Sequence, residues 1–160
     1  MKEKQARGVR NCNPGNIKHG CKWVGLRKEQ TDKDFCQFTK MEWGLRALII
    51  TLRTYVVKRG KKDVASIIKR WAPAEDKNPT SNYIRSCQQS VGNTMYSDNT
   101  EMTAAQKLLM GKLRQFSSDD FKMKNVDEKC ALYGLVKGMC KFESLYNLSY
   151  QEFEYAMQLI

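Results

Sequence analysis

Residues 132–144 read LYGLVKGMCKFES, and their apolar side chains recur at helical spacing. Leu132, Val136 and Met139 are separated by four and then three residues, so they fall on one face of a helix. Glu143 follows four residues after Met139 and lies on the same apolar face. The pattern therefore directs a carboxyl group toward the protein core in the last turn of a helix.

A carboxyl group in this position is a candidate for acid chemistry. Apolar surroundings and the negative end of the helix dipole both favour its protonated form. A protonated carboxyl group can give its proton to a glycosidic oxygen, which is the general-acid step of glycoside cleavage. Glu143 is thus the candidate catalytic acid. The alternative is that Glu143 lies at a frayed helix end, where it faces solvent or pairs with Lys137 or Lys141.

Around this helix the sequence predicts one mostly α-helical domain, of the α or α+β class, over residues 1–160. A chain of 160 residues is long enough to bury a core without covalent cross-links. Helical periodicity and stop signals predict about six helices, near residues 39–60, 63–71, 80–91, 101–116, 125–144 and 149–160. Ser149 with Glu152 is typical of a capping box, and Gly92 is expected to end the third helix. Near the N-terminus, segments 23–26 and 35–38 are typical of a small β-hairpin, joined by the polar residues 27–34.

The composition indicates an anionic partner. The formal net charge is +11, which speeds association with negatively charged surfaces. Nucleic acid and the bacterial cell wall both qualify, although the sequence carries no recognisable nucleic-acid-binding motif. A metal site is not expected, because the sequence has a single histidine and its six cysteines form no C-x-x-C pair. No cofactor is implied.

Hydropathy excludes a membrane-spanning segment, because no apolar run approaches the roughly 18 residues that a transmembrane helix needs. Residues 1–7 are charged and lack the apolar core of a signal peptide. We expect the protein to stay in the host cytoplasm until release, or to travel in a virion, and to act at the cell wall. A monomer is the simplest expectation.

Other side chains are candidates for the same chemistry. Asp32 and Asp34 lie in the predicted hairpin, where a second carboxylate could face a sugar or hold a water molecule. The alternative is local hydrogen bonding within a turn. Trp23 is a candidate sugar-stacking platform, and Tyr83 either reaches a cleft with its hydroxyl group or packs in the core.

A set of motifs within residues 10–92 resembles a group of phage and prophage proteins, often described as virion structural proteins. The motifs are RNCNPGNIK at 10–18, WVG at 23–25, FCQF at 35–38, GLRAL at 44–48 with Tyr55, RWAP at 70–73 and NYI at 82–84. The same order of parts is similar to bacterial glucosaminidases and lytic transglycosylases of the lysozyme-like superfamily. In those enzymes the helix with the catalytic Glu precedes this block, whereas here only about ten residues precede it.

The stretch LVKGMCKFES at 135–144 resembles the Glu-Ser end of that missing helix, displaced to the C-terminal segment 125–160. Our hypothesis is therefore a circularly permuted lysozyme-like fold. The resemblance then implies Glu143 as the acid, Tyr83 as a cleft tyrosine, and Asn13 and Asn16 in a turn that lines the cleft. If Glu143 does not fold back against the hairpin, the chain would keep the shape of such an enzyme without its chemistry.

The sequence thus predicts a muramidase or lytic transglycosylase that cleaves peptidoglycan between N-acetylmuramic acid and N-acetylglucosamine. Either water attacks, assisted by Asp32 or Asp34, or a hydroxyl group of the substrate attacks and gives an anhydro product. One alternative is a non-catalytic virion or wall-binding protein of the same fold. A second alternative is a basic nucleic-acid-binding domain, whose affinity would fall steeply with salt.

Overall fold

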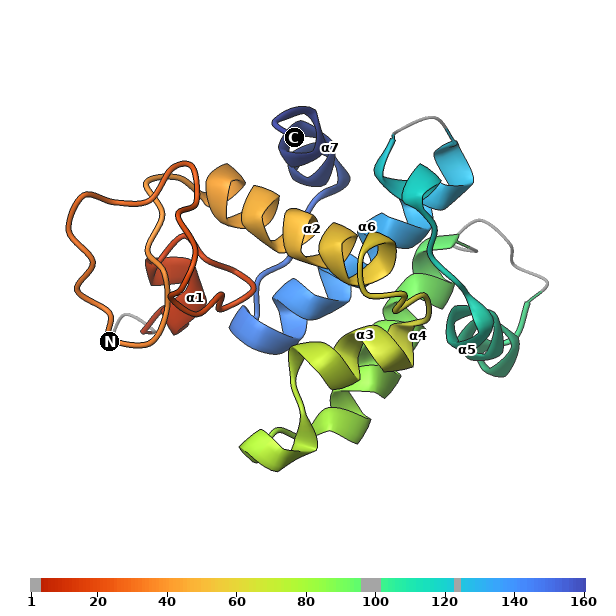
Figure 1. The fold of residues 1–160 in the computed structure, drawn as a ribbon. Helices are drawn as coiled ribbons and strands as arrows, with labels where there is room; N and C mark the ends of the chain where they lie inside the picture. Colours follow the sequence, from red (N-terminus) through yellow and green to blue (C-terminus); the bar gives the residue numbers. More distant parts are fainter. Residues whose placement is uncertain (1–3, 96–101, 123–124) are drawn as a thin grey trace. The chain divides into compact units, whose positions relative to one another are not determined.

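The computed structural model describes residues 4–95, 102–122 and 125–160. These residues are mostly helical, which confirms the predicted mostly-α class (Figure 1). The helices are α1 (Arg7–Arg10), α2 (Met41–Val57), α3 (Val64–Trp71), α4 (Thr80–Met95), α5 (Ala104–Leu113), α6 (Val126–Ser144) and α7 (Tyr150–Gln158), with short 3₁₀ helices η1 (Ala74–Asp76) and η2 (Ser118–Phe121).

The chain divides into two compact units. One unit combines Met1–Thr51 with Cys140–Ile160, and the other is Leu52–Met139. The first unit therefore joins the N-terminal segment to the last turn of α6 and to α7, and the second contains α3, α4 and α5.

The predicted β-hairpin does not form as a pair of strands. Within the described residues, this region has two isolated antiparallel bridges, Lys18 with Phe35 and Leu26 with Phe38. The Gln30 side chain explains why a regular ladder is missing. Its amide nitrogen donates to the Gln37 carbonyl at 2.8 Å, and its amide oxygen accepts from the Gln37 backbone N–H at 2.7 Å. The Gln37 carbonyl oxygen also accepts from the Arg27 backbone N–H at 2.9 Å, so the side chain of Gln30 replaces a strand partner only at the Gln37 N–H.

The core of the first unit forms around the loops and helix ends rather than around a sheet. Ser149 caps α7 in a reciprocal capping box with Glu152, as the sequence predicts. The buried apolar side chains of this unit are Ile17, Cys36, Phe38, Leu45, Ala47, Leu48, Ile49, Cys140, Leu148, Phe153, Ala156 and Met157.

The second unit packs α3, α4 and α5 against one another (Figure 1). Glycines allow close backbone contact: a Cβ on Gly111 of α5 would lie 2.0 Å from the Gln88 carbonyl oxygen of α4. A Cβ on Gly92 of α4 would in turn lie 2.1 Å from the Lys107 carbonyl oxygen. This requirement explains why Gly92, predicted to end a helix, instead lies inside α4, which continues to Met95.

The remaining helix ends follow local capping signals. Asp63 caps α3 by accepting from the Ser66 N–H at 2.7 Å. Thr103 and Gln106 form a capping box at the start of α5, so the predicted helix 101–116 is shorter than expected; Glu101 lies outside the described residues. The four-residue helix α1 was not predicted, because it is too short to show periodicity.

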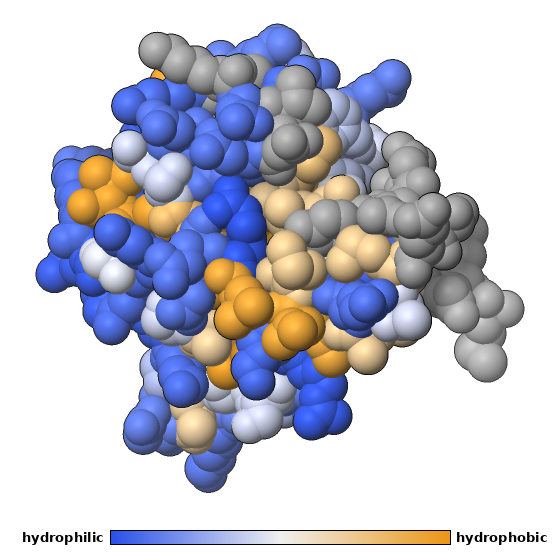
Figure 2. Space-filling model, turned by 90° about the vertical axis from the view of Figure 1, so that its right-hand side faces the viewer, coloured by the Kyte–Doolittle hydropathy of each residue, from blue (hydrophilic) through white to orange (hydrophobic). Residues whose placement is uncertain are grey.

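The surface is polar, as the high content of charged residues leads one to expect. The face drawn in Figure 2 is mostly hydrophilic, with smaller hydrophobic patches. None of the helices in the described part of the chain has the length and apolar character that a bilayer-spanning segment needs. The six cysteines all lie in the described part of the chain, and none of them forms a disulfide there.

Candidate active site

The candidate site is built on the turn at residues 11–17, within the first unit. Asn13 fixes this turn and is fully buried. Its amide nitrogen donates to the carbonyl oxygens of Ile17 at 3.0 Å and Cys36 at 2.9 Å, and its amide oxygen accepts from the Ile17 N–H at 2.9 Å. These hydrogen bonds all go to backbone groups of the turn and of Cys36, so Asn13 fixes the shape of the turn; its place beside a cleft stays a prediction.

Glycines let neighbouring helices approach this turn. A Cβ on Gly44 of α2 would lie 2.0 Å from the Cys12 carbonyl oxygen. A Cβ on Gly8 of α1 would lie 1.9 Å from Ser144 Oγ and 2.7 Å from the Asn13 carbonyl oxygen. The turn is therefore enclosed by α1, the first part of α2 and the end of α6, with no room for larger side chains at Gly8 and Gly44.

The end of α6 is bonded directly to the turn. The Ser144 hydroxyl group donates to the Pro14 carbonyl oxygen at 2.9 Å. The Asn16 amide nitrogen donates to the Glu143 carboxylate oxygen Oε2 at 3.1 Å and to the Glu143 carbonyl oxygen at 3.2 Å. Two residues predicted to belong to one site, Asn16 and Glu143, are thus in direct contact.

The backbone at Asn16 aims its side chain at Glu143. Asn16 has φ 51°, in the left-handed region that asparagine tolerates better than most residues. Its amide oxygen is buried and has no hydrogen-bond partner among the described residues. Glu143 itself is half-buried, so its carboxyl group is neither enclosed in the core nor fully in solvent.

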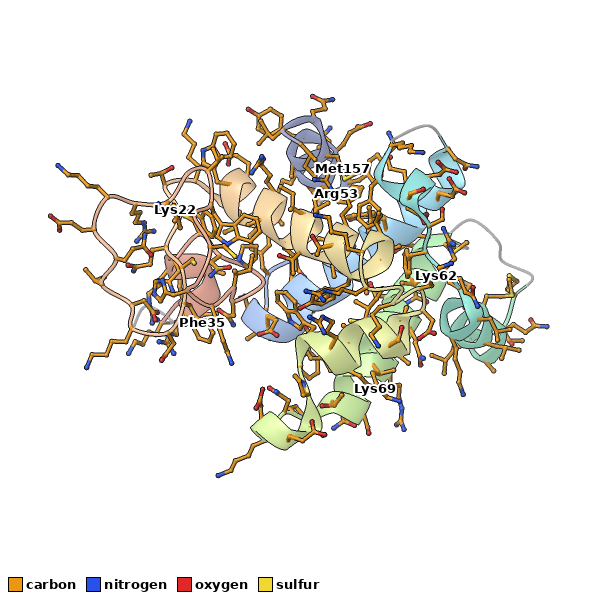
Figure 3. All side chains as sticks on the ribbon, in the orientation of Figure 1. Lys22, Phe35, Arg53, Lys62, Lys69 and Met157 are labelled. Carbon is orange, nitrogen blue, oxygen red and sulfur yellow. The ribbon has the colours of Figure 1, made fainter. Side chains whose placement is uncertain are left out.

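Asp32 and Asp34 are held by Arg7. The guanidinium group binds Asp32 through two hydrogen bonds of 2.6 and 2.7 Å, and Asp34 through one of 2.8 Å. Asn11 donates to Asp32 at 2.8 Å, and Arg7 also lies over the Phe35 ring, 4.5 Å from its centroid (Phe35 is labelled in Figure 3). The hydrogen bonds from Arg7 and then Asn11 hold the pKa of Asp32 well below its usual range.

Asp32 also organises its own loop. One of its carboxylate oxygens accepts from the backbone N–H groups of Asp34 and Phe35, both at 3.0 Å. This is the local turn role that the sequence left open for Asp32. Arg7 was missed by the sequence reasoning, because a charged residue in a helix of four residues carries no periodic signal.

A second carboxylate of this unit lies near the end of α6. The Tyr146 hydroxyl group donates to the Glu152 carboxylate. Burial and this hydrogen bond raise the pKa of Tyr146 above its usual value. Burial acts to raise the pKa of Glu152, but the hydrogen bonds from Tyr146 and Ser149 outweigh it and hold that pKa below its usual value. The sequence identified Glu152 as a helix cap, but not its contact with Tyr146.

The aromatic candidates have different surroundings. Tyr83 is 1 % exposed and belongs to the core of the second unit, as its core-packing alternative required. Trp23 belongs to the first unit and is half-buried, and its indole nitrogen is buried without a hydrogen-bond partner among the described residues. The roles of both side chains in substrate binding stay predictions.

The comparison with known proteins points to phages. The chain is similar to a phage protein. Over 91 residues it is 43% identical to Protein P5 of Pseudoalteromonas phage PM2. The similar region covers 54% of this chain and 56% of Protein P5, so the chain spans little more than half the length of that relative. The sequence matches no family model.

The second unit carries a concentrated basic segment that the sequence reasoning overlooked. Residues 58–62 read KRGKK and connect α2 to α3. Three of these four cations are exposed, and none of the four forms an ion pair with another described residue. Lys69 on α3 is also exposed (Lys62 and Lys69 are labelled in Figure 3). We call residues 58–62 the basic turn.

Proposed function

We propose that this chain cleaves the glycan strand of peptidoglycan, with Glu143 as the general acid. The contact between Asn16 and Glu143 carries the proposal, because it joins the displaced Glu-Ser helix end to the turn that begins the lysozyme-like block. This is the arrangement that a circularly permuted lysozyme-like domain requires. Similarity to a phage protein supports it further, since phages need enzymes that open the wall.

The geometry holds the Glu143 carboxyl group in a defined position. Its oxygen Oε2 accepts the Asn16 hydrogen bond at 3.1 Å, and as general acid the carboxyl group supplies one proton. In the proposed reaction this proton passes to the glycosidic oxygen while the bond from that oxygen to the sugar C1 breaks. The Ser144 contact with Pro14 holds the helix end in place during this step.

The second step of the reaction has two versions. Attack by water at C1 gives a reducing sugar end, whereas attack by a hydroxyl group of the substrate gives an anhydro sugar. Asp32 and Asp34 were the candidate assistants for water. The Asp32 carboxylate is already bound by Arg7, Asn11 and two backbone N–H groups, and these contacts favour a structural role for it. Asp34 is exposed and bound by Arg7, so the version with water would use Asp34.

Digestion of purified peptidoglycan tests the proposal. The wild-type protein is incubated with wall sacculi, and the released fragments are analysed by mass spectrometry. Cleavage between the two sugars is expected, and anhydro or reducing ends then identify the reaction. Absence of glycan fragments from sacculi of several wall types would overturn the proposed enzyme activity.

A non-catalytic binding role at an anionic surface is the second candidate, and the basic turn favours it. Uncompensated Lys and Arg side chains attract polyanions, and that attraction weakens as salt rises. Sedimentation with sacculi and with double-stranded DNA, each at about 50 and 200 mM salt, separates a wall partner from nucleic acid. Binding to sacculi without cleavage would favour the wall-binding role, and preferential DNA binding would favour the nucleic-acid role.

A further inference from the structure

The residue that follows the Glu-Ser pair is unusual in two independent ways. Leu145 has φ 52°, in the left-handed region that leucine rarely adopts. Its side chain is also exposed: 74 % of the residue is accessible, more than for any other exposed large hydrophobic residue in the described part of the chain. Folding thus gains little from this side chain and holds its backbone in an unfavourable conformation.

Helix capping explains the backbone conformation of residue 145, but it does not explain why that residue is leucine. The Leu145 N–H donates to the Lys141 carbonyl oxygen at 3.0 Å, and the Tyr146 N–H donates to the Cys140 carbonyl oxygen at 3.2 Å. This is a left-handed cap at the end of α6, a position where glycine or asparagine is the usual residue. Glycine would make the same backbone bonds with less strain, so stability alone does not account for Leu145.

Strained backbone that the surroundings hold in place is common at functional sites. Here the surroundings are the contacts on either side of Leu145: Ser144 with Pro14, Glu143 with Asn16, and Tyr146 with Glu152. Leu145 is two residues from Glu143, so their Cα atoms are at most about 7 Å apart. A sugar whose glycosidic oxygen lies at Glu143 is therefore within reach of Leu145.

We propose that Leu145 contacts the glycan and recognises an N-acetyl group on the amino sugar beside the scissile bond. The inference rests on the proposed function. An exposed leucine offers no hydrogen bonds, so it suits an apolar part of a polar ligand. Both sugars of the peptidoglycan strand carry an N-acetyl methyl group, which provides such a part. Leu145 is thus a specificity-determining residue that acts beside the catalytic acid.

Two substitutions separate contact with the glycan from a structural role. Leu145→Gly removes the side chain and relieves the backbone strain, whereas Leu145→Ala removes most of the side chain and keeps the strain. We expect Leu145→Gly to raise Tm by about 2–4 °C and Leu145→Ala to leave Tm near that of the wild type. Both are expected to raise KM for soluble N-acetylated glycan about 5- to 10-fold. Leu109→Ala, at an exposed leucine of α5, is the matched control and should change neither value.

A second measurement compares N-acetylated glycan with chemically de-N-acetylated glycan. The wild type is expected to prefer the acetylated strand in kcat/KM, and both variants at residue 145 should lose most of that preference. An unchanged KM and an unchanged preference in both variants would overturn the role of Leu145 while the wild type still cleaves. If the wild type neither cleaves nor sediments with sacculi, the proposed function itself fails, and the role of Leu145 fails with it.

Discussion

The amide group of Asn16 donates a hydrogen bond to the carboxylate of Glu143, across 127 positions of sequence. Asn16 Nδ2 lies 3.1 Å from Glu143 Oε2 and 3.2 Å from the Glu143 carbonyl oxygen. The Asn16 side chain therefore binds both the backbone at the end of α6 and the carboxyl group of Glu143. Ser144 makes the neighbouring contact with Pro14. These contacts give the proposed acid a defined position, which general-acid catalysis requires.

Asn16 is expected to act as a positioning residue for Glu143. Asn16→Gly keeps the left-handed backbone conformation and removes the amide, and should lower kcat about tenfold because the carboxyl group loses its hydrogen bond. Asn16→Asp places a second carboxylate beside Glu143, and should move the high-pH limb of the activity profile upward because two adjacent carboxyl groups resist full ionisation. Steady-state kinetics between about pH 4 and 9 measure both effects. A pH profile identical in Asn16→Asp and the wild type would contradict the role.

Close packing of α1 against the end of α6 predicts a cost at Gly8. The Cβ of Gly8→Ala would lie 1.9 Å from Ser144 Oγ, so we expect a loss of about 1–3 kcal/mol in the free energy of unfolding. Urea denaturation of Gly8→Ala, Ser144→Ala and the double variant measures the coupling. Because Ser144→Ala removes the closest atom, the double variant should lose less stability than the two single losses combined. Strict additivity would show that the two residues do not meet.

Arg7 and Asp32 predict a pH dependence of stability. The pKa of Asp32 is depressed in the folded protein, so its contribution is fully present above the unfolded value of about 4 and is lost as the pH falls below it. Tm of the wild type should therefore exceed that of Asp32→Asn at neutral pH, and the difference should shrink between about pH 5 and 2. Asp34→Asn, whose side chain is 64 % exposed, is the control and should show a smaller difference. A gap between wild type and Asp32→Asn that stays constant over this range would refute the ion pair.

Gly111 tests the packing of the second unit. Glycine to alanine inside a helix normally stabilises a protein, by up to about 1 kcal/mol. Here the new Cβ would lie 2.0 Å from the Gln88 carbonyl oxygen, so Gly111→Ala should instead destabilise by about 1–3 kcal/mol. Thermal unfolding, with Leu109→Ala on the same helix as a near-neutral control, measures this difference. A rise in Tm for Gly111→Ala would mean that α4 and α5 are not in close contact.

Features with local causes could be predicted from the sequence. The Ser149–Glu152 capping box arises between residues three positions apart and forms as expected. The Asp63 cap of α3 has the same spacing, with Ser66. The apolar stripe that leads to Glu143 also lies within one helix, α6, whose predicted bounds differ from the observed ones by a single residue. In each case the interacting residues are close together in the sequence, so the local pattern of residue types is enough to predict the feature.

Features with distant causes could not be derived from local patterns. The Gln30 side chain replaces a strand partner for the Gln37 N–H, so the alternation of apolar and polar residues alone predicted a more regular hairpin than the one that forms. Arg7 reaches Asp32 across 25 positions, and no spacing rule connects them. The left-handed conformation of Leu145 could not be predicted, because glycine or asparagine is the usual residue at such a helix cap and leucine is not. Only the resemblance, and not periodicity, joined Asn16 to Glu143.

The most direct test compares the rates at which Glu143→Gln and the wild type release glycan fragments from purified sacculi. Equal Tm values of the two proteins serve as the control for folding. Glutamine keeps the size of the side chain and can still accept from Asn16, but it has no proton of suitable acidity to give. We predict that Glu143→Gln folds normally, sediments with sacculi and releases glycan fragments about 10² to 10⁴ times more slowly. Equal rates of release by the two proteins would contradict the assignment of Glu143 as the catalytic acid.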